Sequence, residues 1–172
     1  MSEAPKPLSR SEKEAKIKDK AGLVINFFAL LLAVNTFIGG SLSSTIMNNT
    51  IKANDVWNFY QAKSIKQTEY ELAAEQTKNP ALAEEWKAKA ASYEDGKEGK
   101  KELYATAKKL EADRDAAKKS SPWISYASTA FQLSIVVLSA SILAVSMYLF
   151  WGSFAVAAIG IVLMSEGLFM WF

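Results

Sequence analysis

The sequence predicts an all-α membrane protein, in which three transmembrane helices are joined by a long helical hairpin inserted between the first and the second. Residues 21–47, 123–150 and 153–172 are long apolar stretches whose only charged residue is Glu166. About 20 apolar residues are enough to cross a bilayer as a helix. The segment 48–122 is rich in Ala, Lys, Glu and Gln, a composition typical of helices. A chain of 172 residues is too short to cover three such apolar helices with soluble protein.

The first 20 residues form a basic segment that we expect to be helical from about residue 10. Ser9 precedes Glu12 by three positions, and Ser11 precedes Glu14 by three. Either pair can form a capping box, in which the two residues satisfy each other's backbone N–H groups. The first helix is therefore expected to continue from this segment into the apolar stretch 21–47.

We expect the extramembrane segment 48–122 to form a coiled-coil hairpin with arms at 48–79 and 80–120. The arms separate at Asn79 and Pro80, because proline is accepted in the first turn of a helix and disfavours helix in the residue before it.

Two glycines, Gly96 and Gly99, predict a break in the return arm near 96–99. Pro122 is then expected to open the second span. The turn between the second and third spans is expected at residues 151–153, where Gly152 lies between the two apolar stretches.

The charges of the short polar segments predict the orientation in the membrane. The N-terminal 20 residues contain six basic residues, and the turn at 151–153 contains none. The positive-inside rule therefore places the N-terminus in the cytoplasm and the hairpin outside it, in the periplasm if the host is a Gram-negative bacterium. Basic residues within 108–119 favour the opposite orientation, although a long insert counts for less in this rule.

The composition argues against enzymes and cofactor proteins. The chain contains no Cys and no His, so it lacks disulfides, thiolate nucleophiles, imidazole bases and the usual ligands for zinc, copper, haem and iron–sulfur clusters. It also lacks glycine-rich phosphate loops and the spacing of calcium-binding loops. We expect no enzyme activity, no catalytic residues, no cofactor and no metal. A net charge of +2 gives no reason to expect nucleic acid as a partner.

Small residues recur every three or four positions on each apolar stretch, which lets helices approach closely in lipid. The positions expected to serve helix packing are Ala29, Ala33, Gly40, Ser134 and Gly160. Two uses are open: packing within one subunit, which we favour, and a seam between copies.

Glu166 is the one ionisable residue of the apolar stretches, and such a residue is expected to face protein or water. Asn35 and Gln132 lie at a comparable depth, so the three predict an intramembrane polar layer. We favour interhelical hydrogen bonding as its purpose over an ion or proton site, because one carboxylate without a titratable partner makes a poor relay.

The stretch 57–72, WNFYQAKSIKQTEYEL, combines aromatic and basic residues on one part of the first helix. As a helix it presents a face wider than a two-helix seam requires. The residues assigned to this interaction face are Trp57, Phe59, Tyr60, Lys63, Ile65 and Lys66. The alternative is that these aromatics hold the hairpin at the membrane surface, where Trp and Tyr are favoured.

The run WxxYQAKSIKQ, from Trp57 to Gln67, follows an apolar helix and precedes a charged helical segment and a terminal membrane hairpin. In this layout the chain resembles the bacterial family called domain of unknown function 4337 over nearly its whole length. The resemblance implies an inner-membrane protein with three spans and no assigned reaction, and it supplies no catalytic residues.

Our leading hypothesis is a membrane-anchored structural or interaction protein that self-associates or serves as an accessory subunit of a larger membrane complex. Its expected partners are the lipid bilayer and either further copies, in a homo-oligomer, or another membrane protein. The alternative is a small oligomeric channel or transport component, with its polar layer around Glu166.

Overall fold

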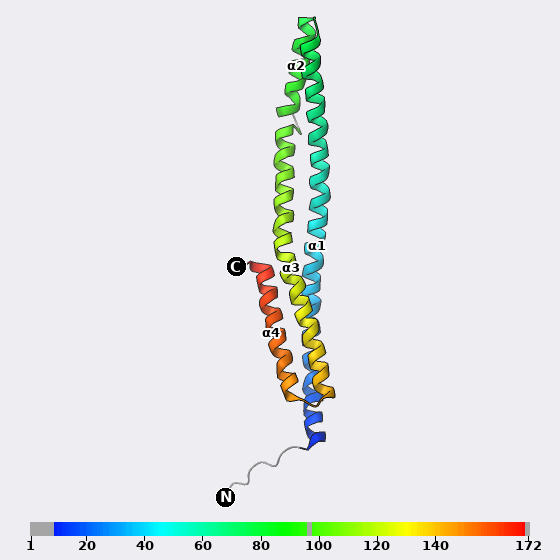
Figure 1. The fold of residues 1–172 in the computed structure, drawn as a ribbon, viewed down its shortest axis with the longest axis vertical. Helices are drawn as coiled ribbons and strands as arrows, with labels where there is room; N and C mark the ends of the chain where they lie inside the picture. Colours follow the sequence, from blue (N-terminus) through cyan, green and yellow to red (C-terminus); the bar gives the residue numbers. More distant parts are fainter. Residues whose placement is uncertain (1–8, 96–97, 171–172) are drawn as a thin grey trace. The chain divides into compact units, whose positions relative to one another are not determined.

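A computed structural model describes residues 9–95 and 98–170, and within these ranges its regular structure is entirely α-helical (Figure 1). The helices are α1 (Arg10–Gln76), α2 (Pro80–Asp95), α3 (Lys100–Leu143) and α4 (Met147–Phe169). The predicted all-α class is confirmed for the described part of the chain. Three helical stretches are long and apolar enough to cross a membrane.

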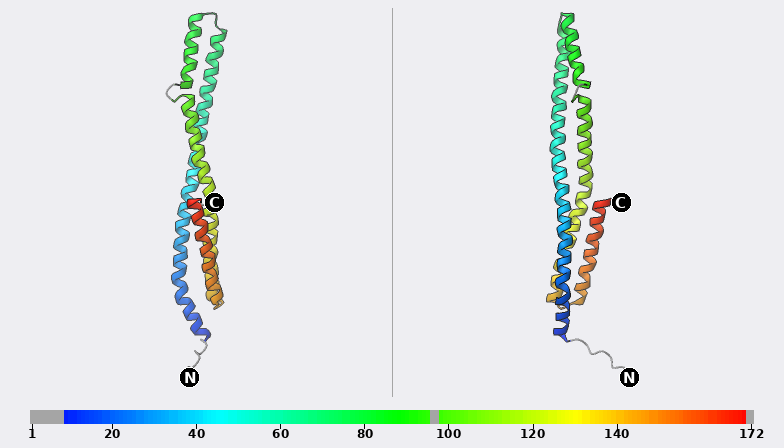
Figure 2. Two further views of the ribbon diagram at one scale, coloured as in Figure 1. Left: turned by 90° about the vertical axis from the view of Figure 1, so that its left-hand side faces the viewer. Right: turned by 180° about the vertical axis from the view of Figure 1, so that it is seen from behind.

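The contacts divide the chain into two units. The first unit contains α1 as far as Ser43, α3 from Lys118 onward, and α4. The second contains the remainder of α1, the whole of α2, and α3 as far as Ala117. Within the second unit, α2 and α3 each run alongside α1 (Figure 2).

Helix α1 begins with a capping box at the predicted place. The Ser9 backbone N–H donates to Glu12 Oε2 at 2.8 Å, and the Glu12 backbone N–H donates to Ser9 Oγ at 3.3 Å. Glu14, which the sequence offered for a second possible capping box with Ser11, forms an ion pair with Lys18 at 3.0 Å. From this cap α1 runs for 67 residues without interruption, so the first apolar stretch and the outgoing arm of the hairpin are one helix.

The buried side of each long helix repeats every seven residues. Every seventh residue of α1 is buried or half-buried when counted from Ala21 or from Ile25, as far as Ala74. The same holds for α3 when counted from Lys100 or from Leu103, as far as Ile142. A seven-residue period is shorter than two straight helical turns and is typical of left-handed coiled coils.

An aromatic and aliphatic cluster forms the core of the first unit. Phe28 of α1 meets Phe154 of α4 edge-to-face, with ring centroids 5.4 Å apart. Leu138 of α3 and Phe150 of α4 are buried in the same cluster. The small residues of α4 allow α3 to pack closely, because a Cβ on Gly160 would lie 2.8 Å from the Phe131 ring.

The turn between α3 and α4 occupies residues 144–146, so its predicted place at 151–153 is wrong, and Gly152 lies inside α4. The Ser146 N–H bonds to the Ser141 carbonyl at 3.1 Å and the Val145 N–H to the Ile142 carbonyl at 3.3 Å. This is a Schellman pattern, in which the residue after the helix adopts the left-handed region. That residue is Val145, with φ 50°. A β-branched residue disfavours this conformation, but here its side chain packs against the core cluster.

Pro122 lies inside α3 and does not open a helix, so the prediction of a new helix there is wrong. The fixed φ of proline is compatible with helix, and the missing N–H removes one bond, to the carbonyl of Lys118. Half-buried Ser121 and buried Ile124 continue the seven-residue rows on both sides of the proline, so packing compensates for that bond.

In the second unit, the buried apolar side chains of the described residues are all alanines. They are Ala53, Ala74, Ala90, Ala107 and Ala117. Such short side chains let two helices approach closely, as small residues do in other close helix pairs. We call this contact the alanine seam.

The two interruptions of the hairpin lie at or beside their predicted places. Asn79 caps α2, since its Oδ1 accepts the Ala81 N–H at 3.0 Å. Helix α2 ends at Asp95 and α3 begins at Lys100, on either side of the predicted break. Gly96 lies outside the described residues. Glu98 adopts φ 57°, and its N–H donates to Glu102 Oε2 at 3.1 Å.

Candidate functional site

The predicted interaction face lies on the part of α1 that belongs to the second unit, and the structure divides it into two sides. Trp57, Tyr60 and Lys63 are half-buried and contact the return arm, whereas Phe59, Ile65 and Lys66 are exposed. The division follows the seven-residue repeat of α1, which places Tyr60 and Lys63 in its buried rows. A single interaction face of all six residues is therefore not what the structure shows.

The inward side begins with three aromatic rings. Trp57 lies edge-to-face with Tyr60 and with Tyr104 of α3, at centroid distances of 5.4 and 5.5 Å. Trp57 Nε1 donates to Glu111 Oε1 at 3.0 Å. Lys108 Nζ donates to Glu111 Oε2 at 2.9 Å and lies 5.6 Å from the centre of the Trp57 ring. Sequence reasoning missed the α3 partners, because a polar helix offers many similar residues at this spacing.

These contacts shift the pKa values of the two charged partners. The hydrogen bond from Lys108, and after it the bond from Trp57, hold the pKa of Glu111 below its ordinary value. The hydrogen bond and charge of Glu111 raise the pKa of Lys108. Both groups therefore stay charged at neutral pH, which maintains the contact between α1 and α3.

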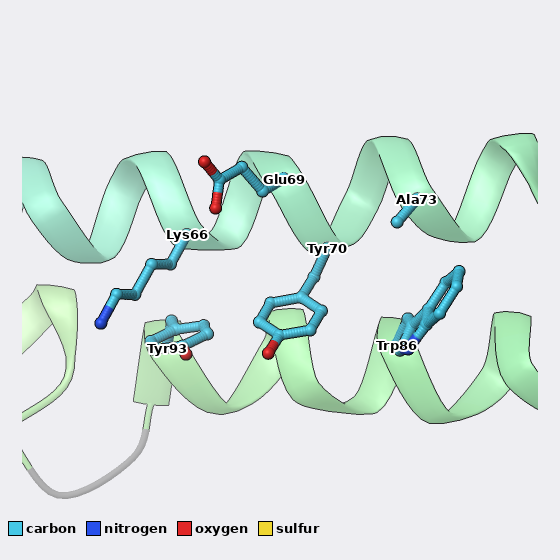
Figure 3. Close-up of a pocket in the computed structure, with 6 residues that line it drawn as sticks. All are labelled: Lys66, Glu69, Tyr70, Ala73, Trp86 and Tyr93. Atoms are coloured by element: carbon cyan, nitrogen blue, oxygen red, sulfur yellow. The ribbon is translucent and has the colours of Figure 1, made fainter.

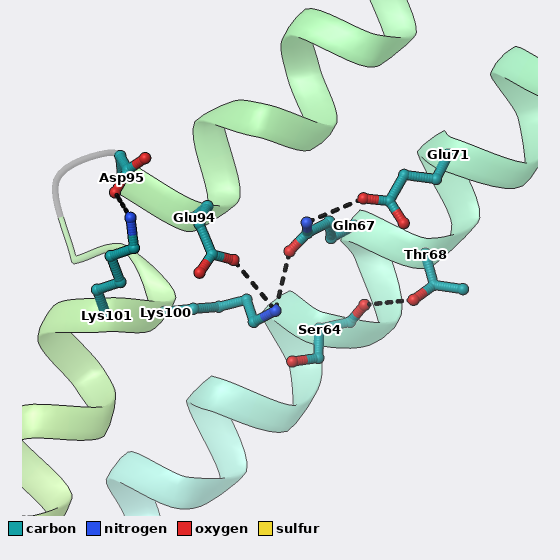
Figure 4. A network of polar contacts seen from close by, with 8 residues as sticks. All are labelled: Ser64, Gln67, Thr68, Glu71, Glu94, Asp95, Lys100 and Lys101. Carbon is teal, nitrogen blue, oxygen red and sulfur yellow. Dashed lines mark hydrogen bonds and ion pairs between the residues drawn. The ribbon is translucent and has the colours of Figure 1, made fainter.

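The inward side continues at the break between α2 and α3, where polar contacts join three helical segments (Figure 4). Lys100 Nζ donates to Gln67 Oε1 at 3.0 Å and pairs with Glu94 Oε2 at 3.3 Å. Lys63 Nζ donates to the backbone carbonyl of Glu98. We call these five residues the clasp: Lys63, Gln67, Glu94, Glu98 and Lys100.

The clasp satisfies one backbone group that the break leaves exposed, the Glu98 carbonyl. Helix ends carry carbonyl and N–H groups without partners inside the helix. Lys63 of α1 binds this carbonyl between α2 and α3, Gln67 of α1 accepts from Lys100 at the start of α3, and Lys100 lies 5.5 Å from the centre of the Tyr60 ring. The inward half of the WxxYQAKSIKQ run therefore stabilises the hairpin where its return arm is interrupted.

The outward side of α1 exposes large apolar residues in the second unit. Phe59 is 63% exposed and Ile65 60%, with Ile51 at 53% and Leu72 at 49%. We call these four residues the outer stripe. Ile51, Ile65 and Leu72 differ in position by multiples of seven, so they lie on one line of a coiled-coil helix. An exposed apolar row of this kind indicates an interaction surface.

A groove with aromatic walls lies beside the outer stripe, between α1 and α2 (Figure 3). Tyr70 and Tyr93 form its floor, stacked with ring centroids 6.1 Å apart. Its lining consists of Lys66, Glu69, Tyr70, Ala73, Trp86 and Tyr93. Two further hollows border Phe59, one toward Leu103 of α3 and one along α1 at Ala62. No three carboxylates converge as metal ligands within residues 9–95 and 98–170.

In the first unit the predicted polar layer is only partly assembled. Asn35 is fully buried, and its Nδ2 donates to the Ile124 carbonyl at 2.8 Å and to Ser128 Oγ at 2.7 Å. Its Oδ1 is buried and accepts no hydrogen bond. Glu166 is also buried, but Gln132 is exposed and lies outside the layer. Ser128, one turn before Gln132 on α3, takes this place and accepts from Asn35.

The residues predicted for helix packing also fall into two groups. Ser134 and Gly160 are buried between helices of the first unit. Ala29, Ala33 and Gly40 are exposed, and nothing lies within 4 Å of a Cβ built on Gly40. On α1 the close approach to α3 occurs at neighbouring Gly39, whose Cβ would lie 3.3 Å from Ile124.

Comparisons with known proteins give one finding. The model of a family described as domain of unknown function (DUF4337) matches residues 17–170 of the chain. Searches of the curated proteins and of the solved structures found no match. The match covers both units, so the clasp and the outer stripe lie within the matched region.

Proposed function

Because this chain belongs to the DUF4337 family, whose description assigns no activity, we propose its role from the structure. The proposed role is that of a membrane-anchored structural or interaction protein, which presents a helical hairpin to a protein partner. The partner is either another copy of the chain or a larger membrane complex in which the chain is an accessory subunit. The role involves no enzymatic reaction.

The surface of the first unit supports the membrane anchor. Its long helices expose large apolar side chains on the sides that face away from one another, and water would disfavour such a surface, whereas lipid would not. Among them are Leu23, Phe37, Leu143, Val162 and Phe169. Length and hydropathy of three helical stretches agree with crossing a bilayer.

The proposed location is the bacterial inner membrane, with the N-terminus in the cytoplasm and the hairpin in the periplasm. The six basic residues of the first 20 support this orientation. Two proposed spans precede the turn at 144–146, so it would lie on the same side as the N-terminus.

The observation that carries the proposed role is the outer stripe. It belongs to the second unit, whose polar composition supports a position outside the bilayer, where lipid would not cover Phe59, Ile65 or Leu72. Monomeric soluble surfaces seldom expose such rows, and burying them against a partner removes apolar area from water.

The test is the mass and composition of the particle extracted in mild detergent. The wild-type particle is expected to exceed the mass of one chain or to contain a second protein. Ile65→Ser with Leu72→Ser should reduce that mass or release the second protein. Leu82→Ser is the matched control, since it removes an exposed leucine of α2 outside the stripe. A wild-type particle of one chain with nothing bound would refute the role.

The placement of the polar layer gives less support to the alternative, a channel formed by several copies. A pore-lining layer would face a shared axis, whereas Asn35 bonds to α3 of its own chain and Glu166 is buried in its own unit. If Glu166→Gln abolished ion conductance and left the particle mass unchanged, the result would favour the channel.

A further inference from the structure

The outer stripe is accompanied by charged residues in a regular order. Lys52 precedes Asp55 by three positions, and Lys66 precedes Glu69 by three. The second pair follows the first after 14 residues, two periods of the repeat of α1. Between the two pairs lies an uncharged layer with Phe59 and Ala62. The exposed side of α1 thus alternates charged and apolar layers along its length.

The four charged residues are free to bind a partner. All four are exposed, and none takes part in an ion pair within the part of the chain that the structure describes. Some other charged residues of the hairpin have partners within the chain, as in the pairs of Lys100 with Glu94 and Lys108 with Glu111. The four unpaired charges lie on the same part of α1 as the exposed apolar residues of the outer stripe.

This pattern is complementary to itself. Two lysines and two acids give the face no net charge, so a partner of a single sign would be attracted to one half of it and repelled by the other. A second copy of the same face, related by a two-fold axis, presents an acid for each lysine and a lysine for each acid. Three common properties of coiled coils agree with this pairing: seven-residue spacing, apolar layers and flanking charges.

From these observations we propose that the partner of the outer stripe is a second copy of this chain, and that the two α1 helices lie parallel. Lys52 and Lys66 of each copy pair with the Asp55 and Glu69 of the other. The parallel direction follows from the membrane, because two copies inserted with the same orientation carry their α1 helices in the same direction. This inference rests on the proposed function and names the partner that the function leaves open.

Complementary charge variants test the pairing. The acidic variant carries Lys52→Glu with Lys66→Glu, and the basic variant carries Asp55→Lys with Glu69→Lys. Like charges would then meet across the seam in each homodimer, and the dissociation constant in mild detergent should rise at least about tenfold for each variant alone. Co-expressed with different tags, the two variants should purify together at a one-to-one ratio and regain the mass of the wild-type dimer.

The matched control is Lys78→Glu with Lys109→Glu, which changes the net charge as much as the acidic variant does, on exposed residues outside the stripe. It should dimerise like the wild type. The helical content of every variant should equal the wild-type value, because none of the substituted side chains has an ion pair to lose within the described part of the chain.

Three results would overturn the inference. Both charge variants could dimerise as the wild type does, or the co-expressed pair could fail to purify together. In the third, the wild-type particle contains a different protein. The double variant Ile65→Ser with Leu72→Ser releases this protein, whereas the charge variants retain it. This third result would leave the proposed function standing, whereas a wild-type monomer with nothing bound would remove both.

Discussion

At the scale of single residues, Glu111 makes the hairpin sensitive to acid. Its pKa is lower in the folded chain than in the unfolded chain, chiefly because of the hydrogen bond from Lys108 and then that from Trp57. A lowered carboxyl pKa stabilises the fold above the unfolded value, which is near 4.5, and this stabilisation disappears as the pH falls through the folded pKa. We expect the stability that Glu111 contributes at pH 7 to be lost as the pH falls below 4.5 and through the folded pKa.

The comparison variant is Glu111→Gln, which retains an oxygen to accept the Trp57 N–H but cannot ionise. Thermal midpoints of wild type and variant should differ at pH 7 and converge as the pH falls below 4.5. A difference that stays constant across this range would show that Glu111 does not act through its charge.

Gly160 is a second residue whose replacement has a defined consequence. The added Cβ of Gly160→Ala would lie 2.8 to 3.2 Å from three carbons of Phe131, a ring that is fully buried. Overpacking of this kind costs about 1–3 kcal/mol, so the thermal midpoint in detergent should fall.

Gly152→Ala is the matched control on the same helix, because nothing lies within 4 Å of the added Cβ. It should be as stable as the wild type or slightly more so. Phe131→Leu combined with Gly160→Ala should recover part of the loss. An unchanged midpoint in Gly160→Ala would mean that α3 and α4 can separate without cost.

At the scale of helices, the clasp determines how firmly α2 and α3 are held at the break. Lys100→Met keeps the aliphatic stem but loses the contacts with Glu94 and Gln67. The Lys100 side chain is only 17% exposed, so we expect amide exchange around residues 90–105 to accelerate about fivefold, near 1 kcal/mol.

Lys101→Met provides the control at the next residue. Lys101 pairs with Asp95 at 2.6 Å, but both side chains are well exposed, and exposed ion pairs contribute little. Its exchange rates should match those of the wild type. Equal acceleration in both variants would assign the effect to general loss of charge instead of to the clasp.

At the scale of the whole molecule, the orientation can be read from single cysteines, because the natural chain has none. Ser11→Cys, Ser92→Cys and Tyr148→Cys place one thiol in the N-terminal segment, in α2 and at the start of α4. In cells with a permeabilised outer membrane, an impermeant maleimide should label only Ser92→Cys. The other two should react after lysis. Labelling of Ser11→Cys and Tyr148→Cys but not of Ser92→Cys would indicate the opposite orientation. Labelling of Tyr148→Cys without labelling of Ser11→Cys would contradict three spans.

Much of the helical layout could be predicted because its signals are local. The capping box at Ser9 and Glu12 and the boundary at Asn79 each depend on neighbouring residues. The turn after α3 could not be predicted in this way, because tertiary packing holds Val145 in a conformation that its side chain disfavours, while Gly152 fits within a helix. The prediction that Pro122 opens a helix was wrong for the same reason, since packing on both sides preserves the helix around it.

The sequence identified the stretch of chain that contains the candidate site, but not which of its side chains form an exposed surface. Composition singled out residues 57–72, and the helical period could not decide which side of α1 faces the return arm. That choice depends on Tyr104, Lys100 and Glu111 of α3, which lie far along the chain. Gln132 was expected in the polar layer only because of its depth along the span. The rotation of α3 about its own axis instead brings Ser128 into contact with Asn35.

The alanine seam has a thermal consequence for the hairpin. Alanine buries little apolar area compared with leucine or isoleucine, so unfolding of the second unit would newly hydrate little such area. The heat-capacity change on unfolding should therefore fall below the usual ~12–15 cal/mol/K per residue. A small heat-capacity change flattens the dependence of stability on temperature. The hairpin should then keep a nearly constant stability from cold to warm conditions, without a sharp optimum.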